Sequence, residues 1–204
     1  MACEHPALAV DLGLKDNGKR WIKFLPQRVD GDYFYYKDKY GDSLLMLPCG
    51  KCSGCVLARR KMWSLRCYAE SLYHQENCFI TLTYDDEHRP EKASKSDFQW
   101  FIKQLRNHGI ECRYFGCGEY GGLTGKFHMH IILFGYFPKD VKYFSKSKSG
   151  FAQFTSKFLS SIWNKGFLTV SEFTPETAAY TAGYVDKKYK VDDSFILMSK
   201  IMLR

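Results

Sequence analysis

Two histidines, His128 and His130, stand in the apolar run KFHMHIILFGYF and form the clearest chemical pattern in the sequence. Residues i and i+2 of a β-strand project from one face, so both imidazoles are expected to point the same way, about 7 Å apart. Two neutral imidazoles on an apolar strand are costly unless something satisfies them. A metal ion bound by both rings is therefore the favoured interpretation, and a structural role for the pair is the alternative.

A third ligand for such an ion would be a nearby carboxylate. Glu119 ends the strand expected just before the histidine strand, and in a hairpin it can lie opposite the histidines. Two imidazoles and one carboxylate leave coordination positions open, which suits Mn²⁺ or Mg²⁺ acting as a Lewis acid on a phosphate. A closed structural zinc site would need a fourth protein ligand.

Two tyrosines and a lysine follow in the segment YTAGYVDK. Tyr180 and Tyr184 are four residues apart and Lys187 comes three residues later, so a helix would align all three on one face. Taken alone, this pattern is more typical of a half-buried amphipathic stripe. Beside a metal site, a tyrosine held in position can attack phosphorus while the cation withdraws charge from the phosphate. Lys187 would then stabilise the phenolate or the transition state.

A cysteine cluster precedes the first long helical pattern. Cys49, Cys52 and Cys55 have the spacing of half a zinc site, and the fourth ligand would come from Cys3 or His5 near the N-terminus. The alternative is three free thiols in a tight turn, which is about as compatible because the sequence has no second C-x-x-C pair. The sequence thus predicts a possible structural Zn²⁺ site.

Two other motifs are rejected. Gly116–Gly121 matches G-x-G-x-x-G, but a turn and a strand follow it, whereas a dinucleotide fingerprint opens a helix. Gly125 and Lys126 resemble the end of a phosphate loop, but the earlier glycine spacing is wrong and Phe127 replaces Ser or Thr. Neither a dinucleotide-binding nor an ATPase module is predicted.

Composition narrows the class of partner. The 204 residues carry a formal net charge of +8, and 17% of them are aromatic. A basic surface attracts polyanions and aromatic faces stack unpaired bases, which points to single-stranded nucleic acid. An aromatic core under a solvated basic surface explains the same numbers equally well. No signal peptide or membrane-spanning run is visible, so we expect a soluble intracellular protein.

The elements that must position these residues indicate an α+β fold with a central, mostly antiparallel sheet that carries the His-x-His strand between flanking helices. We expect an N-terminal extension over 1–55, with the cysteine cluster, and a main domain over 56–204, possibly truncated at its C-terminus. The expected strands are 20–25, 32–38, 78–84, 112–121, 126–137 and 166–171. The expected helices are 56–76, 98–108, 151–163 and 175–188, and a mobile basic loop is expected over 138–150.

Together these motifs resemble those of a known superfamily. HMHIILFG is similar to the His-hydrophobe-His motif of HUH endonucleases, and FITLTY resembles the strand motif that precedes it. YTAGYVDK resembles the two-tyrosine motif of replication initiators from small single-stranded-DNA bacteriophages. CGKCSGC and the following ARRKMWSLRCYAES resemble the gokushovirus-type branch of the Microviridae. The resemblance runs from about residue 49 to residue 188.

The resemblance implies a Rep-like nuclease fold and a metal-dependent endonuclease that initiates rolling-circle replication. Glu119, His128 and His130 would hold the metal. Tyr180 and Tyr184 would be alternating nucleophiles, supported by Lys187, that form a 5′-phosphotyrosyl link at the viral origin in single-stranded DNA. A host helicase and DNA polymerase would be partners, in the cytoplasm of a bacterial host.

Basic side chains would contact the DNA backbone, so binding should weaken with salt. The residues expected to do so are Arg59, Arg60, Arg66, Lys126 and Lys188. The alternative from another class is a zinc-stabilised nucleic-acid-binding regulatory protein without catalysis. In that protein the cysteine cluster and the basic helix would bind DNA, and the histidine pair would be structural.

Overall fold

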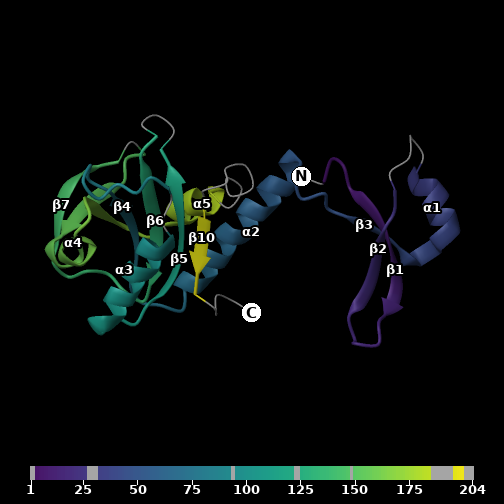
Figure 1. Ribbon diagram of the computed structural model, residues 1–204, viewed down its shortest axis with the longest axis horizontal. Coiled ribbons are helices and arrows are strands. Elements are labelled where there is room, and N and C mark those ends of the chain that lie inside the picture. Colours follow the sequence, from purple (N-terminus) through teal and green to yellow (C-terminus); the bar gives the residue numbers. More distant parts are fainter. Residues whose placement is uncertain are drawn as a thin grey trace. The chain divides into compact units, whose positions relative to one another are not determined.

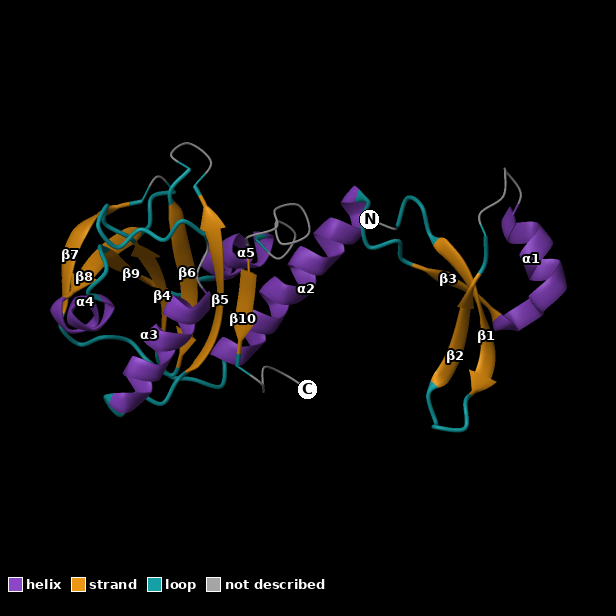
Figure 2. Ribbon diagram, in the orientation of Figure 1, coloured by secondary structure: helices purple, strands orange, loops and turns teal. Residues whose placement is uncertain are grey.

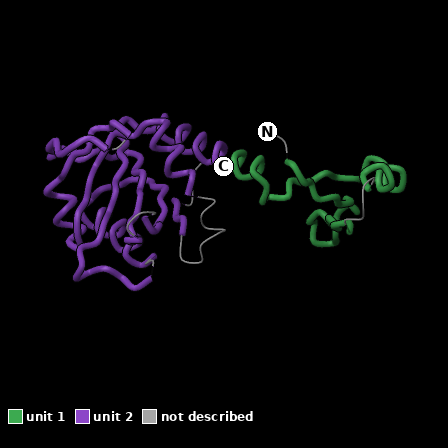
Figure 3. The backbone as a smooth tube through the Cα atoms, turned by 90° about the horizontal axis from the view of Figure 1, so that it is seen from above, with its two compact units in different colours: residues 1–59 green, residues 60–204 purple. Residues whose placement is uncertain are grey.

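The computed structural model describes residues 3–26, 32–92, 95–121, 125–147, 149–184 and 195–199. The chain divides into two compact units, residues 1–59 and 60–204, which are coloured separately in Figure 3. Each unit is considered by itself below. The division at residue 55 into an extension and a main domain stays a prediction. Within the described residues, no helix has both the length and the apolar character needed to cross a membrane.

The first unit holds a small antiparallel sheet with the strand order β2-β1-β3. Its elements are β1 (Ala7–Leu14), β2 (Arg20–Phe24), α1 (Asp32–Tyr40), the 3-10 turn η1 (Gly41–Ser43) and β3 (Leu44–Leu47). The strand expected over 20–25 is confirmed as β2. Around it the sequence reading expected mostly irregular chain, where the structure has two further strands.

The strand expected over 32–38 is wrong, because this segment forms helix α1. Its aromatic residues favour a strand, but tertiary context decides such segments. Asp32 lies in the first turn and Lys37 in the last, where each charge complements the helix dipole. The buried Tyr36 anchors the helix by donating a hydrogen bond to the Pro26 carbonyl at 3.0 Å.

The second unit is built on a seven-stranded sheet with the order β10-β5-β6-β4-β9-β8-β7, and every recorded pairing is antiparallel (Figures 1 and 2). The expected α+β class is confirmed. Its elements are α2 (Ser53–Ser71, which starts in the first unit), β4 (Asn77–Thr83), α3 (Lys95–Asn107), β5 (Arg113–Tyr120), β6 (Phe127–Phe134), β7 (Val141–Lys146), β8 (Ala152–Ser156), α4 (Lys157–Trp163), β9 (Leu168–Glu172), α5 (Pro175–Gly183) and β10 (Phe195–Met198).

Helices cover both faces of this sheet, which explains the long apolar run of β6. Met129, Ile131 and Leu133 face a large core that includes the buried side of α3 and α4. Ile132 and Phe134 face a second core shared with Trp63 and Cys67 of α2 and with Ala178 of α5. Alternate side chains of β6 therefore enter different cores, as the two-residue period of a strand requires.

The segment 138–150 is not the loop expected from its lysines, because it contains β7. The helix expected over 151–163 is also partly wrong: β8 comes first, and α4 begins only at Lys157. Ser156 sets that start, since its side chain accepts a hydrogen bond from the Leu159 amide as an N-cap. Pairing between β7 and β8 satisfies a backbone that the sequence alone left without partners.

Gly116 and Gly118 lie inside β5, which confirms that they form no dinucleotide-binding turn. A Cβ at Gly116 would come within 2.5 Å of the Phe98 ring, and one at Gly118 within 2.6 Å of the Phe195 ring. These glycines therefore let α3 and β10 pack closely against β5.

Candidate active site

The hairpin of β5 and β6 brings three ligand-type side chains together at one end of the strands. Glu119 is paired with His128 across the hairpin, and His130 follows two residues later on the same face. The ligand atoms of the three residues lie within 4.8 Å of one another. The two imidazole centroids are 4.8 Å apart, closer than the strand repeat of about 7 Å predicts, because the rings turn towards each other at 83°.

Glu119 lies between the two rings in a nearly closed environment. Its Oε1 is 3.0 Å from His128 Nε2 and 3.5 Å from His130 Nε2. Glu119 is 4% exposed and His130 is 5% exposed. A buried carboxylate needs a compensating positive charge or hydrogen-bond donors, so the groups that it faces decide what this cluster can bind.

The outer nitrogens of the rings are held by two different acceptors. His128 Nδ1 lies 3.2 Å from the Lys126 carbonyl oxygen, and His130 Nδ1 lies 3.1 Å from Thr81 Oγ1. A carbonyl oxygen only accepts, so the proton of a neutral His128 is on Nδ1 and its Nε2 presents a lone pair to Glu119. A lone pair opposite a carboxylate calls for a cation between them. Two imidazole nitrogens and one carboxylate oxygen thus fit a divalent metal ion, with Thr81 and the Lys126 carbonyl orienting the rings.

Both tyrosines reach this cluster from helix α5. The helix starts cleanly because Thr174 and Thr177 form a capping box and Pro175 occupies the first turn. The Tyr180 hydroxyl lies 3.4 Å from His130 Nε2. The Tyr184 ring stacks on His130 with centroids 5.6 Å apart and planes inclined by 20°. The four-residue spacing therefore places both phenols beside the metal ligands.

The two phenols differ in environment. Tyr180 is 49% exposed, whereas Tyr184 is 9% exposed. Burial raises the pKa of Tyr184 far above its ordinary value, and hydrogen bonding to Tyr180 and Glu119 raises this pKa further. Tyr184 is thus a buried phenol that keeps its proton, and Tyr180 is the phenol open to solvent. Lys187, expected to support them, lies outside the described residues.

Two residues of the site were missed by the sequence reading, although both lie in the strand FITLTY. Phe79 stacks on His130 with centroids 5.4 Å apart, and Thr81 pairs with His130 in the register of β4 and β6. The alternation of β4 places residues 79 and 81 on one face. Which neighbour they meet depends on long-range pairing, which no local pattern reports.

The basic residues expected to contact DNA have varied surroundings. Arg59 donates to the Gly50 carbonyl at 2.6 Å, the Arg66 guanidinium lies 4.9 Å from the Trp63 ring centroid, and Lys126 Nζ lies 3.7 Å from an Asp86 carboxylate oxygen. Arg60 lies on α2, and Lys188 falls outside the described residues. Their role in binding DNA stays a prediction.

The cysteine cluster of the first unit is assembled. The thiols of Cys3, Cys49, Cys52 and Cys55 lie within 4.8 Å of one another. Cys3 and Cys52 Sγ are 3.8 Å apart, and Cys49 and Cys55 Sγ are 4.0 Å apart. A tetrahedral site with Zn–S bonds of about 2.3 Å has S–S edges of about 3.8 Å. The four sulfurs therefore have the separation that one tetrahedral ion requires, and His5 is not in the group.

Backbone amides around these sulfurs favour thiolates. The amides of Lys51 and Cys52 donate to Cys49 Sγ at 3.5 and 3.4 Å and lower its pKa. Gly50, at φ +74°, supplies the turn that aims them. A bond from the Glu4 amide is the main cause that lowers the pKa of Cys52 to about 6. Burial raises the pKa of Cys55 to about 12.

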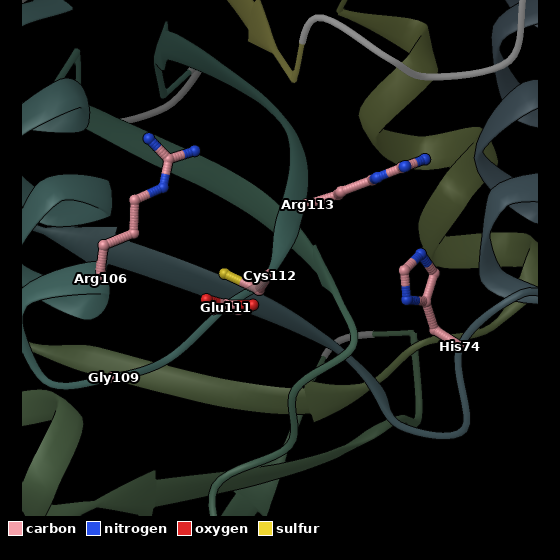
Figure 4. Close-up of a pocket in the computed structure, with 6 residues that line it drawn as sticks. All are labelled: His74, Arg106, Gly109, Glu111, Cys112 and Arg113. Atoms are coloured by element: carbon pink, nitrogen blue, oxygen red, sulfur yellow. The ribbon is translucent and has the colours of Figure 1, made fainter.

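A separate cavity of about 530 Å³ lies near the start of β5, roughly 20 Å along the strand from Glu119. Figure 4 shows Arg106 and Arg113 on either side of it, with Glu111 between them. Arg113 is 2.9 Å from the buried Glu70, which also lies 3.0 Å from His74. The positive charges here have acidic neighbours, and no predicted site residue lines this cavity.

Comparison with known proteins finds relatives among phage proteins. The family model for replication-associated protein ORF2 matches residues 77–189, which include Glu119, both histidines and both tyrosines. Replication-associated protein VP4 of Bdellovibrio phage phiMH2K is 34% identical over 170 residues, covering 78% of this chain and 54% of the relative.

Two further relatives are also phage proteins. Replication-associated protein ORF2 of Spiroplasma virus 4 is 35% identical over 212 aligned positions, covering 95% of this chain and 63% of the relative. Replication-associated protein ORF4 of Chlamydia phage 1 is 33% identical over 155 residues, covering 71% and 39%. The chain thus spans between 39% and 63% of the length of these relatives. No solved structure matches.

Proposed function

We propose, from the premise that the chain belongs to the family of the replication-associated protein ORF2, that it nicks and rejoins single-stranded DNA to initiate rolling-circle replication of a small phage genome. The names of the three relatives support a role in replication. The observation that carries the chemical part is the position of Tyr180, whose hydroxyl lies 3.4 Å from His130 Nε2 at the edge of the ligand cluster.

Glu119, His128 and His130 would hold Mn²⁺ or Mg²⁺, and the bound cation would withdraw charge from the scissile phosphate. This chain contributes the geometry. Thr81 and the Lys126 carbonyl fix the ring orientations, and Glu119 neutralises part of the cation's charge. The nearly closed surroundings of Glu119 and His130 exclude most water, which strengthens the electrostatic interactions at the phosphate.

Tyr180 attacks first, because its phenol is half exposed while that of Tyr184 is buried. Its oxygen forms a bond to phosphorus as the bond from phosphorus to the 3′ oxygen breaks. The phenolic proton is transferred overall to the leaving oxygen, so the products are a 5′-phosphotyrosyl link and a free 3′-hydroxyl. The ester conserves the energy of the broken bond, and the step needs no ATP.

Tyr184 acts in the joining half of the reaction. Its ring lies 5.0 Å from that of Tyr180, so both phenols can address one phosphate position in turn. After one round of synthesis it would cleave the regenerated origin, and the released 3′-hydroxyl would attack the first link to close a circle. Lys187 would stabilise the developing negative charge.

The wider setting follows from this chemistry. The free 3′-hydroxyl is a primer end for a host DNA polymerase, and unwinding would fall to a host helicase in the cytoplasm of the bacterial host. The basic residues of α2, with Lys126 and Lys188, would contact backbone phosphates.

The cysteine cluster would hold a structural Zn²⁺. Four sulfur donors with tetrahedral spacing suit zinc, and the ion would tie the chain near Cys3 to the turn before α2. The ion would thus stabilise the first unit and take no part in cleavage.

Incubation with Mn²⁺ and single-stranded DNA that contains a phage origin, followed by a denaturing gel, tests the proposal. We expect a covalent protein–DNA band that is slow to form with Tyr180→Phe, is lost in the double variant with Tyr184→Phe, and is abolished by His128→Ala. Tyr73→Phe, a change at a tyrosine 77% exposed in the turn after α2, is the matched control. A protein that shifts the DNA but never forms the band would instead be the non-catalytic zinc-stabilised regulator.

A further inference from the structure

A cavity of about 470 Å³ opens directly beside Tyr180 and His130. Residues of β4, β8 and β9 and the first half of α5 line it, together with the segment that joins β7 to β8. Because Tyr180 and His130 belong to its wall, a group attached to a phosphate held at the Tyr180 hydroxyl can enter it.

The wall chemistry selects for an uncharged planar group. Two aromatic rings, Phe79 and Phe151, line the cavity alongside the hydroxyls of Ser147 and Ser171. The lining includes no lysine or arginine among the described residues, and it includes the carboxylate side chain of Glu176. A phosphate would be disfavoured by that composition, whereas a nucleobase offers a flat face for the rings and polar edges for the hydroxyls.

Gln153 is the lining side chain best placed to read such an edge. Phe154 is paired with Val170, so Gln153 lies beside Ser171 on the face that carries the site. Its Oε1 accepts a hydrogen bond from Ser145 Oγ at 3.1 Å, which orients the amide. Within the part of the chain that the structure describes, no bond is made by the Nε2 group, so two N–H donors remain for an incoming acceptor.

We propose that this cavity binds one base next to the scissile phosphodiester and that Gln153 gives the nicking reaction its base preference at that position. The inference rests on the proposed nicking function. It predicts selection for a base that presents a hydrogen-bond acceptor, such as a carbonyl oxygen or a ring nitrogen, to the Gln153 amide.

The test uses Mn²⁺ and a pool of short single-stranded oligonucleotides of random sequence. Covalently captured fragments are sequenced, and base frequencies are aligned on the cut. Wild-type protein should show a preference at a position adjacent to the cut. Gln153→Ala should flatten that preference by about tenfold relative to the other positions, the size expected for one or two lost hydrogen bonds.

Gln153→Glu has nearly the same shape and replaces the donors by an acceptor, so it should shift the preference towards bases with an amino group. It also keeps the test informative if the alanine variant is unstable. Gln75→Ala, at an exposed glutamine outside this cavity, should reproduce the wild-type profile. An unchanged profile for both Gln153 variants would overturn the base-pocket proposal. Absence of any capture by the wild-type protein would overturn the nicking function instead.

Discussion

Replacing Thr81 by valine removes the hydroxyl that lies 3.1 Å from His130 Nδ1 and keeps the shape of the side chain. In the metal-free protein, His130 can respond by moving its proton to Nε2, which faces Glu119 at 3.5 Å. With a metal ion on Nε2 the proton must stay on Nδ1, where valine offers it no acceptor. The cost of the substitution should therefore fall on metal binding.

The size of this effect follows from burial. His130 is 5% exposed, so water has little room to replace the Thr81 hydroxyl. An unpaired buried donor costs about 1–3 kcal/mol, and loss of an outer partner of a metal-bound histidine typically weakens binding by about 10- to 100-fold. Both figures agree, and we expect Thr81→Val to weaken Mn²⁺ binding about 30-fold, or about 2 kcal/mol.

Isothermal titration of Mn²⁺ into the purified protein measures this change. Thr169→Val is the matched control, because Thr169 is paired with Thr81 on the neighbouring strand and is similarly shielded. Thr81→Ser should recover most of the affinity because it restores the hydroxyl. Wild-type affinity in Thr81→Val, or an equal loss in Thr169→Val, would refute the positioning role.

Three further perturbations have defined outcomes. Gly118→Ala should lower the free energy of unfolding in urea by about 1–3 kcal/mol, because the new Cβ would lie 2.6 Å from the Phe195 ring, whereas Gly183→Ala, with no atom within 4 Å of its Cβ, should not; equal effects would contradict the packing argument. Cys52→Ser should abolish stoichiometric zinc binding in a colorimetric release assay and Cys112→Ser should not; retained zinc would exclude the four-thiol site. DNA affinity measured by fluorescence anisotropy should fall linearly with salt on logarithmic axes, and a flat response would exclude phosphate contacts as the main source of affinity.

Local patterns predicted the parts of the site that lie close together in sequence. His128 and His130 share a face because of the strand period, and Glu119 meets them because the hairpin that joins β5 to β6 is short. The helical spacing of Tyr180 and Tyr184 likewise needs no distant partner to be visible. In each case the spacing itself carries the geometry.

Long-range pairing decided what could not be predicted. Thr81 meets His130 only because β4 pairs with β6 across 49 residues. Gln153 reaches the site face only because β8 joins the sheet beside β9, where the sequence predicted a helix. Helix α1 was likewise misjudged as a strand, since its aromatic residues favour strands and its burial depends on Tyr36.

The central claim is that a tyrosine of the α5 segment, Tyr180 or Tyr184, becomes covalently linked to DNA, and peptide mass spectrometry tests it most directly. The protein is incubated with Mn²⁺ and single-stranded origin DNA, digested with nuclease and protease, and searched for nucleotide-modified peptides. The account predicts a phosphonucleotide on one of these two tyrosines, with Tyr180 modified first. Modification of any other residue, or strand cleavage without any modified peptide, would contradict it.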